Sequence, residues 1–175
     1  MLLCCPFMDL DAEIEARIGR SIADIFAHDG ETEFRRIEKE TLKDILETGG
    51  RVLEISPSSS TPACKNQEHP SNERPQMILA LGGGAVMTPE CEKMVHEQTT
   101  CIYLRTSVKE LVARLTDESA GRPLLASSDL KTRIETLMSL RMETYERTAH
   151  LIIDTDSKTI DEVASEITAA LLLKR

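Results

Sequence analysis

Apolar and polar positions along the chain follow two periods, one typical of strands and one of helices. Residues 77–81 are apolar without alternation, which predicts a strand buried on both faces, as in a parallel sheet. Residues 31–48 carry apolar side chains three and four positions apart, which predicts an amphipathic helix. The same reasoning predicts strands at residues 2–8, 51–55, 101–104 and 151–154, helices at residues 12–18 and 129–149, and helices that begin near residues 21, 88, 107 and 159.

Strands and helices alternate from residue 77 onward, and this order predicts an α/β fold with a parallel sheet. The length of 175 residues is that of one ordinary domain, so we expect a single domain over residues 1–175. Residues 56–76 interrupt the pattern because they are rich in proline and serine and lack apolar periodicity. We expect this stretch to be a disordered insertion.

Composition narrows the classes of partner. The net charge is −9 and aromatic residues make up 3% of the chain, which argues against a nucleic-acid partner. The five cysteines form no C-x-x-C pair, and the N-terminal residues contain neither a signal peptide nor a membrane span. We therefore expect a cytoplasmic protein that has no membrane or nucleic-acid partner. We also expect a monomer, and this expectation does not come from the composition.

Three glycines, Gly82, Gly83 and Gly84, follow the apolar run at residues 77–81 directly. Without side chains, their backbone can approach a ligand closely, and open α/β sheets bind ligands at the carboxyl ends of their strands. The alternative is a tight turn that needs positive φ angles. Three consecutive glycines favour the ligand-binding interpretation.

Charged residues near other predicted strand and helix ends are further candidates. Asp9 and Asp11 follow the first strand, where either could cap the next helix or hold a metal ion or a hydroxyl group. Arg35 and Glu38 are three residues apart on a helix, which usually indicates a solvated ion pair. Arg122 lies in a polar loop, where it is either solvated or part of a mobile lid that clamps a phosphate.

Taken together, these motifs and their order closely resemble shikimate kinases. The motifs are an Asp-x-Asp strand end, GRSIADIF at residues 19–26, FRRIE at residues 34–38, LGGGA at residues 81–85, RPLL at residues 122–125, and Arg141 followed by Tyr145. The resemblance implies a three-layer, nucleoside-monophosphate-kinase-like α/β fold with a parallel sheet, the P-loop kinase fold. It also implies transfer of the ATP γ-phosphoryl group, with Mg²⁺, to the 3-hydroxyl of shikimate in the chorismate pathway to aromatic amino acids.

The resemblance assigns a role in shikimate binding to five residues. Asp11 would hold the reacting hydroxyl and take its proton, and Arg35 and Arg141 would bind the carboxylate through paired N–H···O bonds. Gly83 and Gly84 would contact the ring substituents through their backbone.

The resemblance also assigns one residue that positions Arg35 and three residues that serve ATP and the metal ion. Glu38 would orient Arg35, and Arg122 would be the lid arginine that stabilises charge on the transferred group. Arg114 would lie near the adenine, and Asp9 would hold Mg²⁺ through water.

The chain departs from the family pattern at the phosphate-binding loop. The motif G-x-x-x-x-G-K-[ST] occurs nowhere in the sequence, and the first glycine is Gly19. We therefore expect the N-terminal strand and the Walker A loop to be missing and activity to be weak or absent. That strand would be the central one of the family's sheet, so the strands at residues 6 and 77 should flank a gap.

Three explanations remain open. The sequence is the truncated form of a kinase that begins further upstream, or it is a product that has lost ATP binding and remains a non-catalytic binder of shikimate or a similar carboxylate. The third is an unrelated α/β phosphotransferase for another small hydroxy acid.

Overall fold

The computed structural model describes residues 5–48, 77–118 and 127–173. The strand expected at residues 51–55, the expected insertion at residues 56–76 and the RPLL motif at residues 122–125 lie outside these ranges. The chain forms two compact units, Met1–Cys91 and Glu92–Arg175, and each is described by itself.

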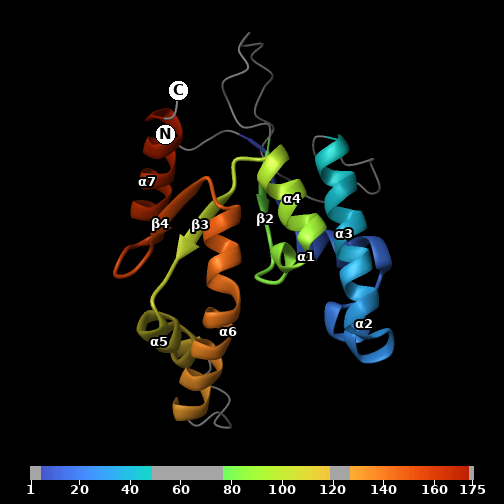
Figure 1. Ribbon diagram of the computed structural model, residues 1–175, viewed down its shortest axis with the longest axis horizontal. Helices are drawn as coiled ribbons and strands as arrows, with labels where there is room; N and C mark the ends of the chain where they lie inside the picture. The colour runs from blue at the N-terminus through green and yellow to red at the C-terminus, as the bar shows by residue number, and fades with distance from the viewer. Residues whose placement is uncertain (1–4, 49–76, 119–126, 174–175) are drawn as a thin grey trace. The chain divides into compact units, whose positions relative to one another are not determined.

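The first unit is built on two short parallel strands, β1 (Phe7–Asp9) and β2 (Ile78–Ala80), in which Phe7 lies beside Ile78 and Asp9 beside Ala80. Between them in sequence come α1 (Leu10–Ile18), α2 (Ile22–His28) and α3 (Gly30–Thr48), and α3 packs against both shorter helices (Figure 1). A short 3₁₀ helix, η1 (Ala85–Met87), follows β2.

Local sequence signals explain where the first two helices begin and end. Asp9 caps α1 and Ser21 caps α2, each with a side-chain oxygen that accepts a backbone N–H. Gly19 ends α1 in the left-handed region at φ 69°, where glycine is the favoured residue. The helices predicted here are thus confirmed, with α1 beginning at Leu10.

The apolar stripe of α3 forms much of the core of this unit, as its periodicity predicted. Among the described residues of the first unit, the buried apolar ones are Leu10, Ile14, Ile25, Phe34, Ile37, Leu42, Ile45, Ala85, Val86 and Cys91. Burial of this stripe against α1 and α2 holds the charged face of α3 in one place, because a close-packed core resists sliding.

Two sequence predictions about the strands are wrong. The strand after residue 77 is not buried on both faces, since Ile78 remains 41% exposed. The first strand and this strand do not flank a gap, because they pair directly and Ile78 donates its backbone N–H to the carbonyl of Pro6 at 2.8 Å. The pairing satisfies backbone groups that a gap would leave without partners.

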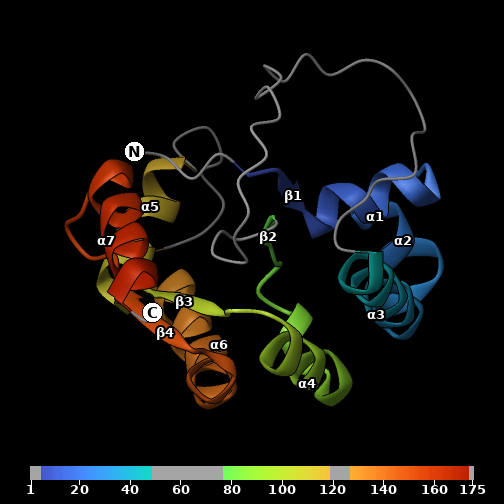
Figure 2. The same ribbon diagram turned by 90° about the horizontal axis from the view of Figure 1, so that it is seen from above.

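The second unit also contains a parallel strand pair, β3 (Ile102–Arg105) with β4 (Leu151–Asp154). Its helices are α4 (Pro89–Gln98), which begins in the first unit, α5 (Val108–Glu118), α6 (Ser127–Thr148) and α7 (Ile160–Leu173). α6 and α7 lie on opposite sides of the strand pair (Figure 2). Tyr103 of β3 meets Tyr145 of α6, with ring centroids 5.2 Å apart.

The predicted helix starts of this unit are confirmed. Ser107 accepts the N–H of Glu110 at the start of α5. Thr159 and Glu162 bond reciprocally at the start of α7, in the manner of a capping box. None of the helices in the described part of the chain combines the length and the apolar character that a membrane crossing requires.

Candidate functional site

Asp9 and Asp11 separate at the start of α1. The carboxylate of Asp9 accepts the backbone N–H of Ala12 at 3.0 Å and so caps the helix, as one of the two sequence interpretations proposed. Asp11 lies inside the first turn and is not needed for the cap. Its side chain is half-buried and lies against Gly82, at the carboxyl end of β2.

Arg35 lies on α3, and its ion pair with Glu38 is not an ordinary solvated one. Nη1 of Arg35 donates to Oε2 of Glu38 at 2.7 Å, and the Glu38 side chain is only 2% exposed. Nη2 lies 3.5 Å from Oε1 of Glu31, and the guanidinium also lies near the ring of Phe34. A buried partner and two further neighbours restrict the rotamers of Arg35, so its guanidinium is already oriented.

The glycines after β2 explain how Asp11 and Arg35 come to be neighbours of one backbone segment. A Cβ atom placed on Gly82 would lie 3.0 Å and 3.1 Å from the two carboxylate oxygens of Asp11. A Cβ atom on Gly84 would lie 2.5 Å from Nη2 and 2.7 Å from Nη1 of Arg35. Neither glycine has a positive φ, so a requirement for positive φ angles does not explain them, although the segment does form a turn. They leave room for two charged side chains.

The electrostatic surroundings of Asp11 raise the pKa of its carboxyl group. Burial raises the pKa of Asp11 above its ordinary value, and the negative charges of Asp9 and Glu15 raise it further. The positive charge of Arg35 opposes this shift. A carboxylate whose pKa is raised in this way accepts a proton more readily than a solvated aspartate.

The Arg35–Glu38 pair has its own balance of effects. Burial lowers the pKa of Arg35, but the hydrogen bond and the charge of Glu38 outweigh burial and leave that pKa raised. Burial raises the pKa of Glu38, against the pull of Arg35. Arg35 therefore stays charged, as binding of an anion requires.

Sequence reasoning missed two residues of this cluster. Gly82 was not singled out from the three glycines, although it follows the strand most directly. Cys91 is fully buried, and burial together with the nearby charge of Glu38 raises the pKa of its thiol to about 11. Such a thiol is not a nucleophile at neutral pH, so Cys91 is a packing residue behind the cluster.

Two of the other predicted site residues belong to the second unit, and one lies outside the described residues. Arg114, on α5, donates to the backbone carbonyl of Thr155 at 3.0 Å and pairs with Glu110. Arg141 lies on α6, so it belongs to the second unit, whereas Asp11, Arg35 and Gly84 belong to the first. Arg122 lies outside the described residues.

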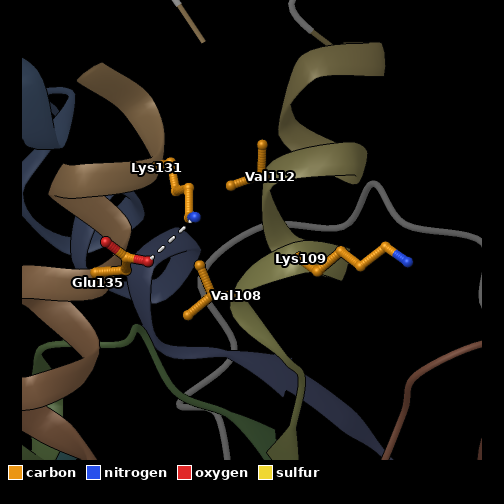
Figure 3. Close-up of a pocket in the computed structure, with 5 residues that line it drawn as sticks. All are labelled: Val108, Lys109, Val112, Lys131 and Glu135. Atoms are coloured by element: carbon orange, nitrogen blue, oxygen red, sulfur yellow. Dashed lines mark ion pairs between the residues drawn. The ribbon is translucent and has the colours of Figure 1, made fainter. Parts of the chain in front are cut away.

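A pocket of about 500 Å³ opens at a place that the sequence did not indicate (Figure 3). Val108, Lys109 and Val112 of α5 line it together with Lys131 and Glu135 of α6, and the last two form an ion pair at 3.6 Å. It contains none of the predicted site residues.

The fold defines the class of protein. The chain is similar to the structure of a shikimate kinase from Acinetobacter baumannii in complex with shikimate, with a TM-score of 0.72, 24% identity, and 98% of this chain and 80% of that chain covered. It is also similar to the shikimate kinase structure from Aquifex aeolicus, with a TM-score of 0.65, 25% identity, and 95% and 81% covered. These are α/β kinases of the P-loop type, and the predicted fold class is confirmed at this level.

Sequence comparison gives the family. A family model described as shikimate kinase matches residues 2–67 and 63–172. A shikimate kinase from Thermus thermophilus is 33% identical over 169 residues, covering 97% of this chain and 77% of the relative. The chain belongs to the shikimate kinase family, whose members are transferases that phosphorylate with ATP in aromatic amino-acid biosynthesis.

Proposed function

We propose that this chain binds shikimate at the Asp11–Arg35 cluster and that the cluster is the acceptor half of a shikimate kinase. The observation that carries the proposal is the approach of both side chains to one glycine segment after β2. A relative of known structure was determined in complex with shikimate, which supports this choice of ligand.

The chemistry of each residue suits one end of the ligand. The charged and oriented guanidinium of Arg35 can grip a carboxylate through two parallel N–H···O bonds. Asp11 can accept the 3-hydroxyl proton, and its raised pKa suits a general base. We assign ring contacts to the backbone of Gly83 and Gly84, and a second grip on the carboxylate to Arg141.

The residues of the chain fit ATP and Mg²⁺ less well than they fit shikimate. The lysine and the hydroxyl of the phosphate-binding loop have no counterpart motif in the sequence. Within the described ranges, no group of three or more potential ligand side chains could hold a metal ion. Arg114 is already bonded to Thr155 and Glu110. The described residues therefore fit shikimate better than ATP and Mg²⁺, although the second carboxylate oxygen of Asp9 could bind a hydrated ion.

We infer that the 175 residues have little kinase activity on their own. The alternative, a non-catalytic shikimate binder, rests on the same cluster and shares its binding chemistry. Turnover separates the two, because a binder releases no ADP when shikimate and ATP are present.

Calorimetry of the full chain with shikimate tests the proposal. Arg35→Ala should weaken binding by a hundredfold or more, because the ligand carboxylate loses a charged bidentate partner. Arg36→Ala is the matched control. Arg36 neighbours Arg35 on α3 but is exposed and pairs with Glu33 and Glu40.

A second pair of variants tests the proposed contact between Arg141 of α6 and the carboxylate of shikimate. Arg141→Ala should weaken shikimate binding at least tenfold, whereas Arg133→Ala, an exposed position on the same helix, should not. Equal affinities for the parent chain and Arg35→Ala would refute the assignment of the site.

A further inference from the structure

The backbone segment from Gly82 to Gly84 lies close to both charged groups of the proposed site. Each group occupies the space that a side chain on one of these glycines would need. Gly82 faces the Asp11 carboxylate, and Gly84 faces the Arg35 guanidinium. The two glycines are separated by one residue, so their Cα atoms lie at most about 7 Å apart.

This segment is also held in shape. The N–H of Ala85 donates to the carbonyl of Gly82 at 3.0 Å, and the N–H of Met87 donates to that of Gly84 at 3.1 Å. Ala85 and Val86 are buried directly after the glycines. The turn is therefore anchored to the core and cannot shift freely to relieve a clash.

The charged groups are restrained from the other side as well. Glu38 holds the guanidinium of Arg35 through a hydrogen bond, and the first turn of α1 carries Asp11 two residues after its N-cap, Asp9. Both helices pack through buried side chains. The packed helices thus place the backbones of Asp11 and Arg35, and the segment from Gly82 to Gly84 limits how far each charged side chain can extend.

We propose that Gly82 is a positioning residue, and that the turn from Gly82 to Gly84 is a spacer that selects substrates by the separation between their hydroxyl and carboxylate groups. This inference rests on the proposed function. Gly82 sets how far Asp11 advances toward the hydroxyl, and Gly84 sets how far Arg35 advances toward the carboxylate. A hydroxy acid with another separation would satisfy only one of them.

A single methyl group tests the spacer. The Cβ of Gly82→Ala would lie about 3.0 Å from the Asp11 oxygens, so the carboxylate must move by a few tenths of an ångström or more. We expect shikimate to bind about tenfold more weakly to this variant by calorimetry.

The decisive readout is a ratio of affinities. The parent should prefer shikimate over its 3-deoxy analogue, because Asp11 loses its hydroxyl partner in the analogue complex. In Gly82→Ala that preference should fall toward one, since Asp11 no longer reaches the hydroxyl. A general loss of stability would lower the affinity for both ligands equally and leave the ratio of the two affinities unchanged.

A double-mutant cycle tests the contact without ligand. Gly82→Ala should lower stability to urea in the parent, but much less in an Asp11→Gly background, where the clashing carboxylate is gone. Additive effects would overturn the inference, and so would a parent-like ratio in Gly82→Ala. If the cycle shows coupling between positions 11 and 82 but the parent chain binds no shikimate, the proposed function is wrong. The substrate-selecting role of the spacer is then wrong as well.

Discussion

At the scale of single residues, the role proposed for Asp11 conflicts with the stability of the folded chain. Its carboxylate is half-buried beside Gly82, and Asp9 and Glu15 add negative charge around it. These effects favour the protonated form, so the ionised form costs stability in the folded chain. A proton acceptor placed in this way suits catalysis better than it suits folding.

Asp11→Asn should therefore stabilise the chain at neutral pH while it weakens shikimate binding. Because the folded pKa of Asp11 is raised, the penalty is present above that pKa and is relieved as the pH falls through it. Urea unfolding at several pH values measures this. The stability gain of Asp11→Asn should shrink on acidification. A gain that grows at low pH would mean that the pKa of Asp11 is lowered instead.

Arg35 shows what sequence spacing can and cannot reveal. The spacing of three residues correctly predicts its pairing with Glu38. It cannot reveal that Glu38 is 1% exposed, because that burial comes from packing of α3 against segments distant in sequence. The helical pattern alone favours a solvated ion pair. The resemblance to the family is what predicts that Glu38 orients Arg35.

At the scale of elements, the cap of α1 separates two roles for Asp9. The cap needs an oxygen that accepts the N–H of Ala12, which asparagine also supplies, whereas a role toward Mg²⁺ needs the charge. Asp9→Ala should lower the free energy of unfolding by about 1 kcal/mol, and Asp9→Asn should lower it by much less.

Urea unfolding followed by circular dichroism measures this difference. If both variants lose equal stability, the charge of Asp9 rather than its hydrogen bond stabilises the first turn. Ser21→Ala at the start of α2 is a comparison in which a cap is lost without a change of charge.

Most elements in the described ranges could be predicted from sequence, because their signals are local. Capping residues at Ser21, Ser107 and Thr159 mark helix starts, and apolar periodicity marks α3. Strand pairing was harder to predict. The register of β1 with β2 joins residues about seventy positions apart, and the apolar run after residue 77 resembles a fully buried strand although Ile78 is exposed.

The roles of the glycines could be predicted only in part. Their number and position after a strand predict close approach of a ligand to the backbone, and what the structure shows is close approach of charged side chains. The approaching groups are side chains of the chain itself, and their identity depends on how α1 and α3 pack. No local pattern contains that information.

At the scale of the whole molecule, each unit of the structure holds a parallel strand pair, and the family's phosphate-loop motif has no counterpart in the sequence. A coupled assay of ADP release with ATP, Mg²⁺ and shikimate should therefore give no turnover above background. The same preparation should bind shikimate by calorimetry, which excludes misfolding as the cause. Robust turnover by these 175 residues would show that another segment supplies the phosphate contacts.

The ordinary backbone angles of Gly82 and Gly84 have an evolutionary consequence. Alanine or serine could adopt the same backbone, but a Cβ atom would meet the carboxylate of Asp11 at Gly82 or the guanidinium of Arg35 at Gly84. In a lineage that no longer uses this site, the two charged residues would drift first and the glycines could then be replaced without strain.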